Sequence, residues 1–360
     1  MANRTLGTTR EIKVHAVVLA VDLHDRKHPI DAELAEFEAL IDAAGARILD
    51  RIVQKRDRVD PAYLTGSGKA AELAGRIKEL GAEMLFVLND LRPRQRRNLA
   101  KIIDVPIIDR TMLILDVFAQ HARTREGKLQ VELAQLKFRQ SNLIGIGTEL
   151  SRLGGGIGTR GPGETKLETD RRKIALRIKV LSHSLEDVRR SRATRRAGER
   201  SEPLVALVGY TNVGKSSLLN RLARSDALVA DQPFATLDPT IRKVYLGPQK
   251  YIRVVDTVGF ISELPADLIA AFRATLEELE QADLLLHVLD ASNSDWPRQQ
   301  ASVDAILGEL QLDAKPRLTV FNKCDAAASE PADAGKYLCV SAKTGAGIDT
   351  LRGELRERFP

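Results

Sequence analysis

Short apolar runs alternate with amphipathic stretches along the first third of the chain. Nearly continuous apolar runs occupy residues 14–21, 46–53, 82–88 and 105–109. Residues 31–45 and 68–81, which lie between these runs, have helical periodicity and end in glycine. Alternation of buried strands with helices is typical of an α/β fold with a parallel sheet. The pattern therefore predicts a small N-terminal α/β domain with a mostly parallel sheet, which we place in residues 1–120.

The next segment carries two helical seams of apolar residues. In the first, Leu129, Leu133, Leu136 and Leu143 are spaced by four, three and seven residues. The second seam consists of Leu167, Ile174, Ile178, Leu181, Leu185 and Val188. Heptad-like spacing on two successive helices predicts a long antiparallel helical hairpin, which with its linker fills residues 121–200.

The ends of this hairpin can also be placed from the sequence. Thr165 followed by Glu168 fits a capping box, so we expect the second helix to start at about residue 165. About a dozen glycine-rich residues join the helices, and the charged stretch 189–203 is expected to be an exposed linker. With a helical rise of 1.5 Å per residue, arms of about 20 residues would hold the joining segment roughly 30 Å from the body.

In the last part of the chain, apolar strand patterns each run directly into a polar motif. The strand LVALV enters Gly209-x-x-x-x-Gly214-Lys215-Ser216, and a helical pattern follows. This is the strand, loop and helix context of a P-loop, in which backbone amides surround phosphate oxygens. Lys215 is expected against the β and γ phosphates and Ser216 on Mg²⁺. We predict a P-loop GTPase domain, doubly wound with a mostly parallel sheet, in residues 201–360.

Later motifs predict that the nucleotide is GTP or GDP. YIRVVDTVG ends in Asp256-x-x-Gly259, which places a carboxylate near Mg²⁺ and a backbone amide at the γ phosphate. The segment FNKCD contains Asn322, Lys323 and Asp325, and a buried carboxylate at Asp325 could accept both guanine donors. Adenine offers neither donor and would leave the carboxylate unpaired. SAKTG resembles the fifth motif of GTPases, whose amide at Ala342 would meet guanine O6.

The segment FATLDPT supplies two candidates for the threonine that reaches Mg²⁺ when a switch loop closes, Thr236 and Thr240. We favour Thr236, because FATL resembles the equivalent loop of related bacterial GTPases. The Mg²⁺ ligands expected are then Ser216, Thr236 and Asp256. The residues assigned to the nucleotide are Gly209, Tyr210, Thr211, Asn212, Val213, Gly214, Lys215, Ser216, Ser217, Phe234, Ala235, Thr236, Asp256, Thr257, Val258, Gly259, Asn322, Lys323, Asp325, Ser341, Ala342 and Lys343.

One position departs from the pattern of many GTPases. Where they place a glutamine after the DxxG glycine to orient the attacking water, this chain has Phe260. Phenylalanine cannot hydrogen-bond water, so we expect intrinsic hydrolysis to be slow, with Lys215 and the Gly259 amide as the groups that stabilise the transition state. In GTPases with a hydrophobic residue at this position, an asparagine equivalent to Asn212 commonly helps to bind K⁺, which makes K⁺ a candidate cofactor.

Charge is concentrated in the hairpin segment. Residues 122–200 carry a net charge of +10, whereas the whole chain carries +6. A basic segment of this kind is expected of a protein that contacts a polyanion, although a solvated helical face has the same composition.

The run LGGGIGTRGPGE at residues 153–164 places six glycines at the predicted tip. Glycine lets backbone approach RNA closely while arginine supplies charge. The residues we consider candidates for RNA contact are Arg152, Gly154, Gly155, Gly156, Arg160, Gly161, Gly163, Lys166, Arg171 and Arg172.

No run of about 18 apolar residues is present, so we expect no membrane span. The N-terminus lacks the apolar stretch of a secretory signal, and the two cysteines, Cys324 and Cys339, predict no disulfide framework. We expect a cytoplasmic protein that is monomeric.

The segments LSRLGGGIGTRGPGETKLETDRR, GYTNVGKSSLLN, FATLDPT, DTVGFI and NKCD together resemble the HflX family of ribosome-associated GTPases. The resemblance implies GTP-dependent binding to the large ribosomal subunit and its RNA, with the arm near the peptidyl transferase region. It also implies dissociation or rescue of stalled ribosomes under stress such as heat. The helix TLRGELRERF completes the GTPase domain, and we expect no extra C-terminal domain.

Two other functions fit the same residues. The basic arm could hold precursor RNA in a GTP-dependent assembly or RNA-processing factor. Alternatively, the hairpin could dock on a protein in a GTP-regulated switch, with its arginines serving solubility.

Overall fold

The computed structural model describes residues 13–23, 29–153, 162–196, 202–224, 239–261, 278–327 and 337–359. For residues 143–153, 162–167, 189 and 192–196 it describes the backbone alone. The chain divides into two compact units, one of Met1–Asp116 with Asn142–Ile157 and the other of Val117–Ser141 with Gly158–Pro360. The division into three parts at residues 120 and 200 stays a prediction.

The first unit contains the predicted α/β domain. Four parallel strands, β1 (Val14–Leu23), β2 (Ala46–Arg56), β3 (Met84–Val87) and β4 (Ile107–Asp109), form a sheet in the order β2-β1-β3-β4. The helices are α1 (Ile30–Ala43), α2 (Ser67–Leu80), α3 (Pro93–Ala100) and the start of α4 (Arg110–His121). The sequence pattern had indicated α1 and α2 but not α3.

Both faces of this sheet are covered by apolar side chains. On one face, Leu19 of β1 belongs to a buried cluster with Leu73 and Ile77 of α2. On the other, Phe37 of α1 meets Phe86 of β3 edge to face, with ring centroids 6.4 Å apart. Burial on both faces explains why the strands are almost continuously apolar in sequence.

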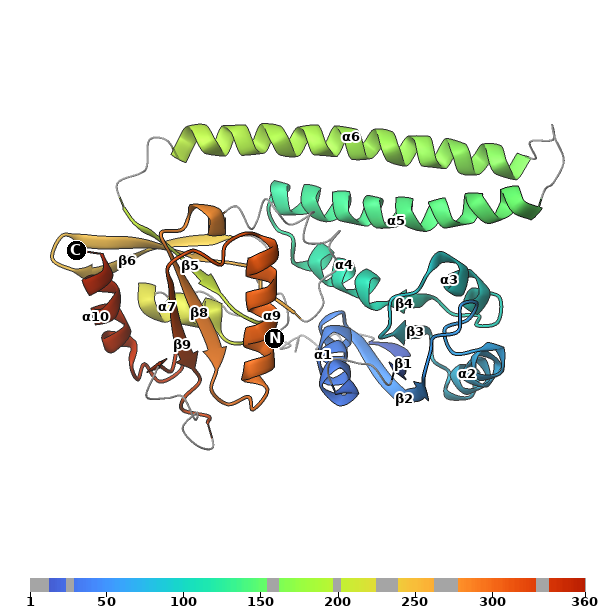
Figure 1. Cartoon of the computed structure of the whole chain (residues 1–360), viewed down its shortest axis with the longest axis horizontal. Coiled ribbons are helices and arrows are strands. Elements are labelled where there is room, and N and C mark those ends of the chain that lie inside the picture. The colour runs from blue at the N-terminus through green and yellow to red at the C-terminus, as the bar shows by residue number, and fades with distance from the viewer. Residues whose placement is uncertain are drawn as a thin grey trace, which may run out of the picture. The chain divides into compact units, whose positions relative to one another are not determined.

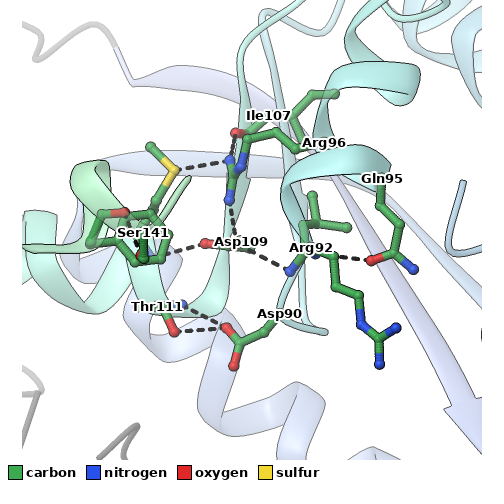
Figure 2. A network of polar contacts seen from close by, with 11 residues as sticks. Asp90, Arg92, Gln95, Arg96, Ile107, Asp109, Thr111 and Ser141 are labelled. Atoms are coloured by element: carbon green, nitrogen blue, oxygen red, sulfur yellow. Dashed lines mark hydrogen bonds and ion pairs between the residues drawn. The ribbon is translucent and has the colours of Figure 1, made fainter. Parts of the chain in front are cut away.

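A polar network joins the loops at the carboxyl ends of β3 and β4 (Figure 2). The buried carboxylate of Asp109 accepts hydrogen bonds from the backbone amides of Leu91 and Met112, at 3.2 and 3.0 Å, and pairs with Arg96. Burial raises the pKa of Asp109, and the Arg96 charge opposes that rise. The Thr111 hydroxyl donates to Asp90 at 2.7 Å. These contacts fix the loops that precede α3 and α4.

Two long helices follow, α5 (Arg125–Leu153) and α6 (Pro162–Arg196), and they run antiparallel (Figure 1). Leu133 of α5 is buried with Leu181 and Leu185 of α6. The Arg177 guanidinium pairs with Glu132 of the facing helix at 2.7 Å. Contacts among the predicted seam residues thus confirm the helical hairpin.

The hairpin differs from the expectation at its ends. Helix α6 begins at Pro162, three residues before the predicted capping box, because proline favours the first helical turn, where its missing N–H costs nothing. It continues to Arg196, so the stretch that was expected to be a linker from residue 189 is helical for eight residues. The arms have 29 and 35 residues rather than about 20.

The second unit also contains a six-stranded sheet in the order β10-β9-β8-β5-β7-β6. Its strands are β5 (Leu204–Val208), β6 (Thr240–Gly247), β7 (Lys250–Asp256), β8 (Leu284–Asp290), β9 (Arg317–Asn322) and β10 (Leu338–Cys339). The helices are α7 (Lys215–Ala223), α9 (Trp296–Glu309) and α10 (Ile348–Arg358). All neighbouring strands are parallel except β6, which is antiparallel to β7. The predicted doubly wound GTPase fold is confirmed.

No helix among the described residues is long and apolar enough to cross a membrane. Cys324 and Cys339 both carry free thiols.

Candidate nucleotide site

The P-loop connects β5 to α7 and is held in shape by two glycines with positive φ. Gly209 has φ 153° and Gly214 has φ 89°. A Cβ atom at Gly209 would lie 2.4 Å from the carbonyl oxygen of Val288, and one at Gly214 would lie 2.4 Å from Nδ2 of Asn322. Neither position has room for a side chain, so the loop backbone can follow this course only with glycine there.

Lys215 is the first residue of α7, and its ammonium group lies inside the loop. The Nζ atom donates to the carbonyl oxygens of Gly209 and Tyr210, at 3.0 and 2.7 Å. Burial lowers the pKa of Lys215 to about 8, although the negative charge of Asp256 opposes this shift. The ammonium is therefore still charged at neutral pH. It lies inside the loop, next to the carbonyl oxygens of Gly209 and Tyr210.

A hydroxyl at the start of α7 lies next to a carboxylate at the carboxyl end of β7. The Ser216 hydroxyl donates to Oδ2 of Asp256 at 2.5 Å. Asp256 is the last residue of β7, and the neighbouring Thr257 hydroxyl donates to the carbonyl oxygen of Leu207 at 2.6 Å. A carboxylate and a hydroxyl at one point are the hard oxygen ligands that Mg²⁺ prefers. Within the described residues no group of three or more His, Cys, Asp or Glu side chains could hold a metal.

The DxxG loop packs directly against the P-loop. A Cβ atom at Gly259 would lie 2.8 Å from Cγ2 of Thr211 and 3.1 Å from Nζ of Lys215. The next residue, Phe260, accepts from the Thr211 amide at 2.7 Å and donates its own amide to the Gly209 carbonyl oxygen at 3.1 Å. The phenyl ring of Phe260 is buried in the core of the sheet. The sequence had shown that this residue cannot orient water, but not that its backbone pairs with the P-loop.

Asn322 joins the P-loop to the SAK loop. It is the last residue of β9, and its Nδ2 donates to the carbonyl oxygen of Val213 at 2.9 Å. Its Oδ1 accepts from the backbone amide of Ala342 at 3.0 Å. The amide that was expected to meet guanine O6 is therefore also engaged with Asn322. Because Asn322 bonds to both loops, it fixes their separation.

Asp325 lies in the turn after β9, and its carboxylate is exposed rather than buried as expected. The reason is its place beyond the end of the strand, where the Ser341 hydroxyl donates a hydrogen bond to it at 2.6 Å. This hydrogen bond, with smaller contributions from the charges of Lys343 and Lys323, holds the pKa of Asp325 below its usual value. The carboxylate is thus ionised and accessible for recognition.

Two residues outside the GTPase sequence motifs hold the loops that follow β9 and β10. Asp290, at the end of β8, pairs through Oδ2 with Nζ of Lys323 at 2.7 Å. Arg221 of α7 donates to the carbonyl oxygen of Thr344 at 2.7 Å. For Asp290 the sequence did hold a signal, since HVLD is an apolar strand ending in a carboxylate, as VVD is at Asp256. Arg221 had no such signal.

The switch segment is only partly described. Phe234, Ala235 and Thr236 lie outside the described residues. Thr240 is the exposed first residue of β6 and pairs in register with Asp256. The choice between the two threonines therefore stays a prediction.

Of the RNA-contact candidates, Gly154, Gly155, Gly156, Arg160 and Gly161 lie outside the described residues, and Arg152, Gly163 and Lys166 are described only as helical backbone. Arg172 is 79% exposed and pairs with Glu168 at 3.1 Å. Arg171 lies 4.0 Å from the same carboxylate. Exposed pairs of this kind are weak, so both guanidinium groups can exchange partners.

Three family models match successive parts of the chain. Residues 31–119 match the model described as GTP-binding GTPase N-terminal, and residues 121–199 match GTP-binding GTPase Middle Region. Residues 204–323 match the model described as 50S ribosome-binding GTPase.

The chain is also similar to curated proteins over most of its length. It is 47% identical to GTPase HflX of Lacrimispora saccharolytica, covering 95% of this chain and 82% of that protein. It is 45% identical to GTPase HflX of Escherichia coli, covering 91% and 79% of the two chains. A crystal structure of SsGBP in complex with GDP superposes with a TM-score of 0.53 at 23% identity, covering 96% of this chain and 98% of that one, which shows a shared fold.

Proposed function

Because the chain belongs to the HflX family of GTPases, which bind and hydrolyse GTP, we propose that it uses this activity to act on the ribosome. In the proposal, the GTP-bound protein binds the large subunit near the peptidyl transferase region and promotes dissociation or rescue of stalled ribosomes in the cytoplasm. The observation that carries the proposal is the basic α5–α6 hairpin in a chain whose GTPase domain has a preformed P-loop. The model match described as 50S ribosome-binding GTPase supports it.

The geometry supports a specific role for the P-loop lysine. The Lys215 ammonium already lies inside the loop, where its two carbonyl partners hold it. Phosphate oxygens are stronger acceptors than these carbonyls, so Lys215 can turn to the β and γ phosphates without leaving the site. Backbone amides of residues 209–216 and the N-terminus of α7 complete the phosphate cradle.

The residues present fit a magnesium ion. Ser216 and Asp256 contribute a hydroxyl and a carboxylate that already lie 2.5 Å apart. Thr236 would add a third oxygen in the proposed closed switch. When bound, Mg²⁺ would neutralise negative charge that develops on the phosphates during hydrolysis. Asn212, whose φ of 60° places it in a tight exposed turn, is the residue we propose for K⁺.

Guanine recognition is assigned to the loops after β9 and β10. Asp325 is ionised and accessible, and it can accept hydrogen bonds from the two guanine donors. Lys323, held by Asp290, can cover one face of the base. Asn322 sets the distance between this pocket and the phosphate loop, because it bonds to both.

Hydrolysis is expected to depend on a partner. The side chain after the DxxG glycine is buried in the core, and its backbone pairs with the P-loop, so it offers no group to an attacking water. Binding to a large particle that orders the switch segments would position the attacking water instead. This arrangement would couple GTP hydrolysis to ribosome binding, with release after hydrolysis.

Sedimentation with ribosomes tests the proposal. With a non-hydrolysable GTP analogue the protein should pellet with 50S subunits and 70S ribosomes, and with GDP it should stay in the supernatant. Association with precursor particles alone would favour an assembly factor instead. Absence of any ribosomal association in both nucleotide states would leave a protein-docking switch as the function.

A further inference from the structure

The antiparallel ribbon formed by β6 and β7 has an unusual outer face. Of the six large apolar side chains that are exposed in the described part of the chain, three lie here: Ile241, Tyr245 and Tyr251. Tyr245 pairs in register with Tyr251, while Val244 and Ile252 are buried on the opposite face of the ribbon. The tyrosines therefore project away from the core of the sheet.

The two tyrosines form a tilted aromatic pair. Their ring centroids lie 5.3 Å apart at an interplanar angle of 57°. The Lys243 ammonium lies 4.3 Å from the centroid of the Tyr251 ring. Tyr251 is thus held between two neighbours, and Tyr245, which is 51% exposed, is the outer ring. A ring held in place in this way loses little conformational entropy when a planar ligand stacks on it.

The ribbon is also strongly basic. Residues 240–253 contain Arg242, Lys243, Lys250 and Arg253 and no acidic residue. Charges on an edge strand commonly prevent strand-to-strand aggregation, and β6 is an edge strand (Figure 1). That role explains the lysines but not two exposed tyrosines, whose large apolar surface works against it. Lys243 pairs with the carboxylate of Glu202, a partly exposed ion pair that a phosphate can replace. Lys250 and Arg253 add two further cations. Exposed aromatic rings among these cations fit a polyanion with planar bases.

We propose that the outer face of this ribbon binds single-stranded RNA. An unpaired base stacks on Tyr245, and Tyr251 packs beside that ring. Lys250 contacts a flanking phosphate, and Lys243 contacts another by exchanging Glu202 for it. Proteins that bind single strands combine aromatic platforms with basic grooves in this manner. A protein partner is disfavoured by complementarity, because Lys243 and Arg253 separate Ile241 from the two tyrosines. The proposal deepens the ribosome-binding function, on which it rests only for identifying the RNA as ribosomal.

The ribbon site can be tested apart from the nucleotide site. Thr240, at the far end of β6, pairs with Asp256, whereas Tyr245 lies at the end next to the turn before β7. Substitution of Tyr245 should therefore leave intrinsic GTP hydrolysis and the GTP Kd unchanged. These two values show that each variant is folded.

The direct experiment measures binding of the full chain, with a non-hydrolysable GTP analogue, to a fluorescein-labelled 12-nucleotide single-stranded RNA by anisotropy. Tyr245→Ala should weaken binding about 5- to 150-fold, the range for loss of one stacked base. Tyr245→Phe keeps the ring and should bind like the unmodified protein. Log K falls as log salt rises, and Lys250→Ala should make this negative slope shallower by about 0.7, because one phosphate contact is lost. Equal affinity of Tyr245→Ala and Tyr245→Phe would overturn the proposal.

Mapping of the residues that contact RNA distinguishes binding at the ribbon from binding at the basic α5–α6 hairpin. Ultraviolet cross-linking of the same RNA, followed by mass spectrometry, should identify Tyr245 or Tyr251 as a cross-linked residue. Cross-links confined to α5 and α6 would overturn the proposal, even if affinity had fallen.

Ribosome sedimentation then separates the two proposals. Loss of ribosome binding by Tyr245→Ala, with unchanged oligonucleotide binding, would indicate a protein contact and overturn the RNA assignment. Tyr245-dependent oligonucleotide binding by a protein that fails to pellet with ribosomes would contradict the proposed function and leave the ribbon site standing.

Discussion

His287 makes the stability of the GTPase sheet depend on pH. It lies in the middle of β8, fully buried, in register with Val208 of β5. Neither of its ring nitrogens hydrogen-bonds to another residue that the structure describes. Burial, together with the charges of Arg317 and Lys215, lowers the pKa of His287 to about 3. The imidazole is therefore neutral in the folded protein.

The size of the effect follows from this shift. In the unfolded chain His287 has an ordinary pKa of 6.5, so the unfolded state takes up a proton as the pH falls below that value and the folded state does not. The contribution of the neutral imidazole is complete above pH 6.5 and is lost progressively toward pH 3. With about 1.4 kcal/mol per pKa unit, the loss between pH 7.5 and pH 5 is about 2 kcal/mol.

The assay compares urea unfolding of the unmodified protein and His287→Leu at these two pH values. Trp296 is the only tryptophan, and its ring centroid lies 5.1 Å from that of Phe321 in β9. Its fluorescence therefore reports unfolding of this sheet. The difference in unfolding free energy between the two proteins should change by about 2 kcal/mol in favour of the leucine variant at pH 5. His183→Leu, at an exposed position on α6, is the control and should follow the unmodified protein. Parallel pH profiles for the unmodified protein and His287→Leu would show that His287 does not cause the pH dependence.

Four further substitutions test the site and the hairpin. Lys215→Ala removes the ammonium inside the P-loop and should abolish binding of a fluorescent GDP analogue; retained binding would contradict the assignment. Asp325→Asn should shift preference from guanine toward xanthine nucleotides in competition binding, and unchanged GTP selectivity would contradict the base-recognition role. Arg221→Ala frees the carbonyl oxygen of Thr344 and should weaken GDP binding by about 1 kcal/mol, measured by calorimetry, whereas unchanged affinity would show that the contact is dispensable. Leu181→Ala should destabilise the α5–α6 contact by about 2–5 kcal/mol in hydrogen exchange, while Leu176→Ala, at an exposed position, should not; equal effects would contradict the seam.

Much of the fold could be predicted because burial leaves a periodic trace in the sequence. The continuous apolar run of β1 follows from burial on both faces, and the leucines of the hairpin follow from contact along one stripe. Strand β6 was missed because its two faces differ: Val244 and Leu246 are buried, while Tyr245 between them is exposed among basic residues. In the sequence, this alternating edge strand resembles a continuation of the preceding switch segment.

The site shows the same division between what local sequence dictates and what tertiary contact adds. Gly209, Gly214 and Lys215 are recognisable because the loop backbone requires those residue types. The exposure of Asp325 and the pairing of the Phe260 backbone with the P-loop depend on segments distant in sequence, and no local pattern encodes them.

Control of ribosome binding by GTP is tested most directly by the fraction of protein that pellets with purified 50S subunits in a GTP analogue and in GDP, with Lys215→Ala as the nucleotide-free control. We expect strong association with the GTP analogue and little with GDP or for Lys215→Ala. Equal association in all three conditions, or association in none, would contradict it.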